Sequence, residues 1–218
     1  MTSSEENYLK TIYHIGAMHS GSVLTSQIAD RMNTTSASVT DMIKRLSEKN
    51  LLDYERYRGV KMTRKGEKMA LGVIRRHRLW EVFLTDILNF KWDEVHVLAE
   101  ELEHVSSDEL ISRLDTYLGH PRFDPHGDPI PDQSGKLVQA SGRLLSEMEA
   151  GSGVILSGVN DHTSAFLRFL EKKGLKPGVK FTVLERDEFD SSLLIRFTDG
   201  NTTFLSHQAA QQILIRHD

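Results

Sequence analysis

The sequence TSQIADRMNTTSASVTDMIKRLSEKNLLDYERYRGVKMT, residues 25–63, carries two short helical patterns followed by an alternating pattern. Apolar residues recur at helical spacing in both helices, and the inward positions are Ile28, Ala29, Met32, Val39, Met42, Ile43 and Leu46. Thr25 or Ser26 can cap the first helix. The alternation across Arg58-Gly59 predicts a two-stranded hairpin.

A helix predicted over residues 5–18 precedes this stretch, so helices followed by a basic hairpin predict a winged helix-turn-helix. The recognition helix should begin near Ser36, where small side chains allow close approach to a major groove. The candidate DNA-binding residues of this helix and of the hairpin are Thr35, Ser36, Ala37, Ser38, Thr40, Lys44, Arg45, Arg56, Arg58 and Lys61. Much of the affinity should then be electrostatic and salt-dependent. The alternative is a three-helix bundle that binds no nucleic acid.

Charge is divided unevenly along the chain, although the net charge is only −4. Residues 1–78 hold 14 Lys and Arg against 8 Asp and Glu, and the remainder holds 13 against 23. Residues 79–120 hold ten acids, opposed only by Lys91 and Arg113. A basic first third suggests a polyanion as partner and an acidic middle suggests a cation, whereas the alternative is a merely solvated surface.

Composition places the chain among ordinary globular proteins, with 218 residues, 39% apolar and 27% charged. The absence of cysteine excludes disulfides, zinc fingers, iron–sulfur clusters and thiol nucleophiles. The chain has no run of about 18 apolar residues, and its start, MTSSEENYLK, does not resemble a signal peptide. We therefore expect a soluble, cytoplasmic protein with two or three modules and no membrane partner.

The rest of the chain predicts a mainly helical protein with a small β-barrel at its carboxyl end. One long helix is expected over residues 65–89 and one or two more over 93–118. Four prolines then make residues 119–135 an extended connector. Residues 136–150 suggest a last helix or a bridging segment. From Gly153 onward, five short β-prone runs and one helix, HTSAFLRFLEKKG, predict the barrel.

Two of the middle helices present residues that bind divalent metals. His77 and Glu81 are spaced i, i+4 and so share a helix face. On the following helix, an arc of about 100° holds the histidines and acids His96, Glu100, Glu103 and His104, apart from the apolar stripe. A divalent cation would remove the repulsion between these carboxylates. The alternative is a solvated acidic face with structural histidines.

Nitrogen and oxygen donors without sulfur suit manganese, ferrous iron or zinc rather than copper(I). A carboxylate-bridged di-iron enzyme needs a Glu-x-x-His pair on two helices, and only Glu101 and His104 have that spacing. No nucleophile elbow, phosphate-binding glycine loop or H-E-x-x-H motif is present. We therefore do not expect an enzyme.

Five motifs, in order along the chain, resemble those of the diphtheria toxin repressor family of metal-activated transcriptional repressors. They are YLKTIY, YERYRGVKMTRKG, RRHRLWEVFL, ELEHVSSDEL and DPHGDPIP. The resemblance implies a winged helix-turn-helix in residues 1–72, a helical dimerisation and metal-binding domain in 73–140, and an SH3-like domain of FeoA type in 150–218. It also implies a homodimer that binds palindromic operators on double-stranded DNA when loaded with Mn²⁺ or Fe²⁺.

The resemblance further implies two metal sites. The ligands of one would be Asn7, Glu100, Glu103 and His104. Glu100 is similar to manganese-type members, whereas Asn7 matches neither the iron nor the manganese branch, and Lys10 stands where the manganese branch has glutamate. The ligands of the other would be His77, Glu81, His96, Asp124, His126 and Asp161. His162 is a rival to Asp161, and ordinary turn chemistry is the alternative role for Asp124 and His126.

These expectations combine into a metal-activated, sequence-specific DNA-binding repressor that controls metal homeostasis. Metal binding would select one arrangement of the first helix, and thereby of the DNA-binding domain of each subunit. The alternative from another class is a winged-helix regulator that senses a small molecule or peptide through its carboxy-terminal barrel, without metal control. A protein-interaction module with no preference for duplex DNA is a further alternative.

Overall fold

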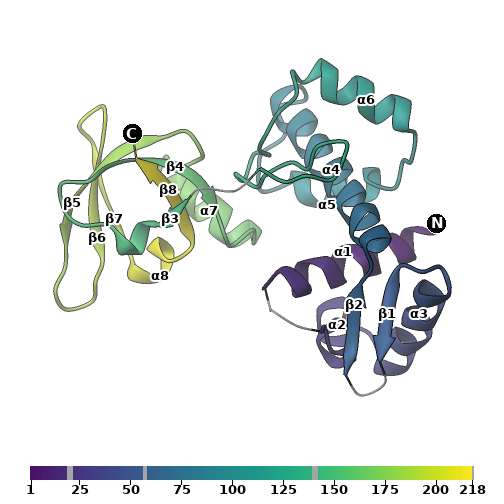
Figure 1. Ribbon diagram of the computed structural model, residues 1–218. Coiled ribbons are helices and arrows are strands. Elements are labelled where there is room, and N and C mark those ends of the chain that lie inside the picture. Colours follow the sequence, from purple (N-terminus) through teal and green to yellow (C-terminus); the bar gives the residue numbers. More distant parts are fainter. Residues whose placement is uncertain (19–21, 56–57, 139–141, 218) are drawn as a thin grey trace. The chain divides into compact units, whose positions relative to one another are not determined.

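The computed structural model describes residues 1–18, 22–55, 58–138 and 142–217 (Figure 1). The chain forms two compact units whose segments alternate along the sequence. The first unit comprises Met1–His77, Glu100–Ile111 and Pro131–Leu137. The second comprises Arg78–Ala99, Ser112–Ile130 and Val138–Asp218. No helix within the described ranges is both long enough and apolar enough to cross a membrane.

The first unit contains the predicted winged helix-turn-helix. Its elements are α1 (Ser3–Met18), α2 (Thr25–Met32), α3 (Ser36–Glu48), β1 (Leu52–Glu55) and β2 (Gly59–Met62). Helix α1 packs against both α2 and α3. The core of this unit includes the fully buried side chains of Leu9, Ile12, Ile28, Ile43, Leu46 and Leu51. The predicted inward positions Ile28, Val39, Ile43 and Leu46 are thus confirmed.

The N-caps of α3 and α2 and the hairpin glycine Gly59 test the local sequence signals of this domain. Thr35 caps α3, because its hydroxyl accepts a hydrogen bond from the Ser38 amide at 3.3 Å. The predicted cap of α2 was wrong: Leu24 is the N-cap residue, and its amide donates to the Gln27 side chain at 2.8 Å. Gly59 has φ of +90°, and a Cβ there would lie 2.4 Å from the Val23 carbonyl oxygen, so this position requires glycine.

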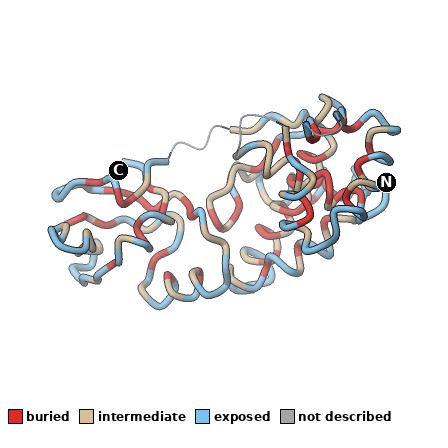
Figure 2. Tube along the Cα trace, turned by 90° about the horizontal axis from the view of Figure 1, so that it is seen from below, coloured by how far each residue is buried: buried red, intermediate tan, exposed pale blue. Residues whose placement is uncertain are grey.

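Three helices follow the hairpin: α4 (Arg64–Asp86), α5 (Val95–Leu102) and α6 (Asp108–Tyr117). Helix α4 begins in the first unit and ends in the second, whereas α5 does the reverse. Buried residues recur at intervals along the helices, and in several strands a buried residue is followed by a less buried one (Figure 2). The predicted number and order of these helices are confirmed.

A six-stranded antiparallel sheet dominates the carboxy-terminal part of the second unit. Its order is β3-β8-β4-β5-β6-β7, and its strands are β3 (Arg143–Leu144), β4 (Gly153–Val159), β5 (Lys180–Arg186), β6 (Leu193–Phe197), β7 (Thr202–Leu205) and β8 (Ile213–His217). Helices α7 (Ser164–Lys172) and α8 (His207–Ala210) complete this part. We call this part the sheet domain.

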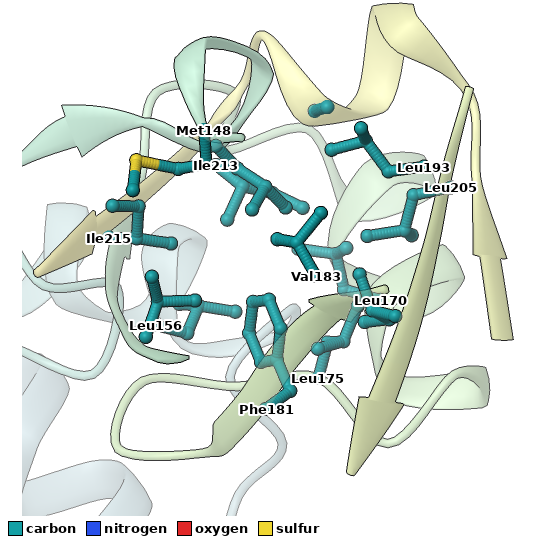
Figure 3. Close-up of a cluster of buried hydrophobic side chains, with 14 of the residues drawn as sticks. Met148, Leu156, Leu170, Leu175, Phe181, Val183, Leu193, Leu205, Ile213 and Ile215 are labelled. Atoms are coloured by element: carbon teal, nitrogen blue, oxygen red, sulfur yellow. The ribbon is translucent and has the colours of Figure 1, made fainter. Parts of the chain in front are cut away.

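The core of the sheet domain is formed by side chains from several strands, from α7 and from the loops, which point toward one another (Figure 3). The five predicted strands and the predicted helix are present, so the class is as expected. Among the strands that the structure describes, β3 and β7 are edges, so the sheet is open rather than closed into a barrel.

Of the two alternatives for residues 136–150, a last helix or a bridging segment, the helix does not form in the described part of that segment. Arg143 and Leu144 instead pair with Ile215 and Leu214 of β8, and only a single 3₁₀ turn, η1 (Leu145–Glu147), follows. Residues 139–141 lie outside the described residues. Pairing with a distant strand outweighs the local helical pattern here.

Candidate metal centre

Glu81, Asp124 and His126 bring their ligand atoms together inside the second unit. Glu81 lies on α4, and the other two lie in the connector that follows α6. All three residues are buried, and one ligand atom from each lies within 4.8 Å of the others. We call these three residues the Glu81 group.

The connector around Asp124 is a tight turn. One carboxylate oxygen, Oδ1, accepts hydrogen bonds from the His126 amide at 2.8 Å and from the Asp128 amide at 3.0 Å. The other oxygen, Oδ2, lies 3.5 Å from Nε of Arg78 on α4. Arg78 also donates to the Pro129 carbonyl and to Asp128. Turn chemistry therefore accounts for one oxygen of Asp124 and leaves the other facing charged groups.

The His126 ring is oriented by its neighbour Trp92. The Nε2 atom of His126 lies 2.8 Å from the Trp92 carbonyl oxygen, and the two rings stack at 5.9 Å with an interplanar angle of 17°. Because a carbonyl oxygen can only accept, Nε2 carries the proton. The other ring nitrogen, Nδ1, lies 3.8 Å from Glu81 Oε2 and 4.0 Å from Asp124 Oδ1. This orientation is typical of a histidine that binds metal through Nδ1.

The electrostatics of the Glu81 group favour a bound cation. Burial, together with the Glu81 and Asp128 carboxylates, raises the pKa of Asp124 to about 7. Burial opposes charge on His126, but the Glu81 hydrogen bond and carboxylate outweigh it and raise the pKa of His126 to about 9. Neighbouring carboxylates contribute to both shifts, whereas burial adds to the first and opposes the second. Oxygen and nitrogen donors with this excess of negative charge fit a divalent metal ion.

His96 and His77 flank Glu81. The Nδ1 atom of His96 lies 3.3 Å from Glu81 Oε1, and the His96 side chain is half exposed. His77 precedes Glu81 by one turn of α4, so the two side chains share a helix face. Within the first unit, His77 Nδ1 lies 2.7 Å from Glu103 Oε2.

The sheet domain brings His162 to this centre. The His162 ring lies 5.2 Å from the His126 ring, and its Nε2 atom lies 3.0 Å from the Val159 carbonyl oxygen. Burial lowers the pKa of His162, which favours the neutral ring that metals bind. Asp161 uses its Oδ1 atom to accept from the Thr163 amide at 2.8 Å, just ahead of α7.

A second cluster of charged groups joins α1 to the residues at the end of α5 in the first unit. Lys10 donates from Nζ to both oxygens of Glu103, at 2.6 and 2.8 Å, and Nζ lies 3.6 Å from Glu100. The Glu103 side chain is fully buried. Although burial raises the pKa of Glu103, His77 and Lys10 outweigh it and lower that pKa below its usual value.

Four further residues lie around this cluster. His104 Nδ1 lies 2.6 Å from Glu6 Oε2, and Arg76 donates to the other Glu6 oxygen at 2.9 Å. The side-chain oxygen of Asn7 is buried and has no hydrogen-bond partner among the described residues. An unsatisfied buried acceptor is costly, so this oxygen is a candidate metal ligand. Sequence reasoning did not identify Glu6 or Arg76, whose partners lie 98 and 70 residues away.

The candidate DNA-binding residues lie at the start of α3 and on the hairpin. Most of these candidates are exposed, namely Thr35, Ser36, Ala37, Ser38, Lys44, Arg45, Arg58 and Lys61, and Thr40 is half-buried. Arg58 forms an exposed ion pair with Glu55 at 3.1 Å. Arg56 lies outside the described residues. The described part of this surface is therefore accessible and mostly polar or basic.

Comparison with known families gives three adjacent matches. Residues 1–60 match the family described as iron dependent repressor, N-terminal DNA binding domain. Residues 63–132 match iron dependent repressor, metal binding and dimerisation domain. Residues 143–217 match the FeoA domain.

Individual proteins give matches of similar extent. The chain is 30% identical over 200 residues to the iron-dependent repressor IdeR of Mycobacterium bovis, with 84% of each chain covered. It is 34% identical over 131 residues to the diphtheria toxin repressor of Corynebacterium jeikeium, which covers 60% of this chain and 54% of that protein. A manganese-dependent transcriptional repressor, solved as a complex with manganese, has a TM-score of 0.87 at 34% identity, with 98% of this chain and 99% of that chain covered.

Proposed function

Because this chain belongs to the diphtheria toxin repressor family of metal-dependent transcriptional repressors, we propose that metal held by the Glu81 group controls its affinity for operator DNA. The family expected from the sequence is confirmed. The protein is a metal-activated, DNA-binding transcriptional repressor of metal homeostasis, with Mn²⁺ or Fe²⁺ as co-repressor, and it forms a homodimer. It is not an enzyme, since its relatives are repressors.

The observation that carries the proposal is the burial of three ligand residues around one point. The group holds two carboxylates and one imidazole. Burial and the neighbouring carboxylates raise the pKa of Asp124, and the carboxylates of Glu81 and Asp124 raise the pKa of His126. When bound, a divalent ion supplies the positive charge that this group lacks. Such oxygen and nitrogen donors suit Mn²⁺ or Fe²⁺.

We assign the remaining ligand candidates around two centres. The Glu81 group would be completed by His77, His96 and a residue ahead of α7, either Asp161 or His162. The other centre would use residues of α1 and of the α5 end, namely Asn7, Glu100, Glu103 and His104. Two observations support this second assignment: the buried Asn7 oxygen has no hydrogen-bond partner in the part of the chain that the structure describes, and the Glu103 carboxylate is buried.

Helix α1 links the second centre to the helices of the DNA-binding domain. Its residues Glu6 and Lys10 contact His104 and Glu103, and the same helix packs against α2 and α3. A ligand set shared by Asn7 and Glu103 would favour the arrangement in which α1 lies against the α5 end. A tenfold preference for one arrangement corresponds to about 1.4 kcal/mol, so modest differences in coordination suffice for control.

Dimer symmetry implies the form of the operator. Two subunits related by a two-fold axis would present two copies of α3, and recognition helices about 34–36 Å apart enter successive major grooves. We therefore propose a palindromic operator and a cytoplasmic site of action, where such DNA is reached. We propose functional boundaries at residues 1–72, 73–140 and 150–218, and the three family matches follow the same order along the chain.

Fluorescence anisotropy of labelled operator DNA, with Mn²⁺ or with chelator, tests the proposal. Mn²⁺ should raise the DNA affinity of the unaltered chain, and Glu81→Gln combined with His126→Gln should abolish that rise. Glu101→Gln is the matched control, because Glu101 is an exposed acid near the end of α5. Equal DNA affinity with and without chelator would contradict metal control and favour a regulator that senses a small molecule through its sheet domain.

A further inference from the structure

The connector that carries Asp124 and His126 lies against strand β4 of the sheet domain, backbone to backbone. A Cβ on Gly127 would lie 2.2 Å from the Ser157 carbonyl oxygen and 2.4 Å from the Gly158 Cα atom. A Cβ on Gly158 would lie 3.0 Å from the His126 carbonyl oxygen and 3.2 Å from the Gly127 Cα atom. No side chain fits between the two segments. We call the contact between residues 126–127 and 157–159 the glycine seam.

Strand β4 is shaped to receive the connector. Its pairing with β8 shifts register between Leu156 and Gly158, which marks a bulge in the strand. Just beyond the bulge, the Val159 amide donates a hydrogen bond to the His126 carbonyl oxygen at 3.0 Å. Leu156, immediately before the bulge, points into the sheet-domain core (Figure 3). The glycine seam is therefore anchored to a strand that contributes to the core of the sheet domain.

Contacts restrain the carbonyl, the amide and the ring of His126 and leave its Nδ1 atom facing Glu81. Its carbonyl is held by Val159 and its amide by Asp124. Its ring stacks on Trp92, which itself packs against the sheet-domain core. With Nε2 directed to the Trp92 carbonyl, only Nδ1 faces the Glu81 group.

We propose that Gly127 and Gly158 are positioning residues for the metal centre, through which the sheet domain sets the place of His126 Nδ1 and thereby the metal affinity of the Glu81 group. This inference rests on the proposed function of that group. The sheet domain then acts as a template for the centre, beyond any ligand that it contributes. Groups that orient metal ligands typically change metal affinity ten- to a hundredfold when they are altered.

Alanine variants with matched controls test the proposal. Gly158→Ala places a Cβ against the His126 carbonyl and requires a shift of a few tenths of an ångström. Its control is Gly153→Ala in the same strand, where a Cβ meets nothing within 4 Å. Gly127→Ala is the harsher change, and its control is Gly178→Ala, because both glycines have φ of +93° but Gly178 is surrounded by open space. This pair separates backbone strain from close approach.

Isothermal titration of the full chain with Mn²⁺ gives the affinity and the number of ions, and circular dichroism gives the folded fraction. Gly158→Ala should fold and bind Mn²⁺ about ten- to a hundredfold more weakly. At excess Mn²⁺ it should regain the operator affinity of the unaltered chain, which a purely structural defect would not permit. Gly153→Ala and Gly178→Ala should match the unaltered chain in Mn²⁺ affinity.

A folded Gly158→Ala chain with unaltered Mn²⁺ affinity would overturn the proposal. Hydrogen exchange of the unaltered chain provides a second test that needs no variant. Because coupling is reciprocal, Mn²⁺ uptake should slow exchange of the Val159 amide, and unchanged exchange at full metal occupancy would also overturn the proposal. Failure of the proposed function would look different, since Mn²⁺ would then leave the operator affinity of the unaltered chain unchanged.

Discussion

Removing the Lys10 ammonium should destabilise the metal-free chain and make its stability more responsive to Mn²⁺. Lys10→Met keeps the length of the side chain and deletes its charge. The ammonium contacts both oxygens of Glu103 at 2.6 and 2.8 Å, the Lys10 side chain is only 14% exposed and Glu103 is fully buried. Deleting one partner of a buried ion pair costs about 3–5 kcal/mol, because it leaves the other charge uncompensated.

The expected loss corresponds to a fall in melting temperature on the order of 10 °C for a chain of this size. Lys44→Met is the control, since that ammonium is largely exposed and lies 3.6 Å from Asp41. Exposed pairs contribute at most about 1 kcal/mol. Saturating Mn²⁺ should raise the melting temperature of Lys10→Met more than that of the unaltered chain, because the metal no longer competes with an ammonium for Glu103.

Differential scanning fluorimetry with and without Mn²⁺ measures both effects. Equal melting temperatures for Lys10→Met and Lys44→Met in chelator would show that the Lys10–Glu103 pair does not hold α1 to the α5 end. An equal response of Lys10→Met and the unaltered chain to Mn²⁺ would show that the ammonium and the metal do not share Glu103.

Three further predictions concern pH, salt and the hairpin. Between about pH 7 and 9, Mn²⁺ affinity should rise about tenfold per pH unit, because metal displaces one proton from His126, whose pKa is raised to about 9. Titration calorimetry at several pH values measures this dependence, which should be lost in His126→Gln. The logarithm of operator affinity should fall steeply with the logarithm of salt concentration, and Lys61→Ala should make the slope shallower by about 1, whereas an unchanged slope would exclude a phosphate contact. Gly59→Ala should lower the free energy of unfolding in urea by more than about 1 kcal/mol, and Gly200→Ala, at the same φ of +90° in open space, should cost less.

Local patterns in the sequence predicted those parts of the fold that local forces determine. The helical spacing of Ile28, Val39 and Ile43 gave the winged helix-turn-helix, because burial of one face stabilises each helix. For residues 136–150 the local pattern left a helix and a bridging segment open. The described part forms no α-helix, because its pairing with β8 depends on a partner distant in the sequence, which leaves no mark on local periodicity. The 3₁₀ turn after β3 and helix α8 were missed for a similar reason, because tertiary packing stabilises such short elements.

In the candidate site, too, the sequence predicted some residues and not others. The spacing of His77 and Glu81 on one helix and the motif DPHG were visible in the sequence, and the structure buries Glu81, Asp124 and His126 together. The partners that orient or neutralise these side chains were not visible. Trp92 reaches His126 across 34 residues, and Lys10 reaches Glu103 across 93. Such contacts depend on the folded arrangement of elements, which residue spacing alone does not contain.

Anomalous X-ray scattering at the manganese absorption edge, from crystals grown with Mn²⁺, locates the bound ion. We expect an anomalous peak bonded to a Glu81 oxygen and to His126 through Nδ1, with Nε2 still directed to the Trp92 carbonyl. Strong manganese peaks elsewhere in the map, with none at Glu81 and His126, would contradict this expectation.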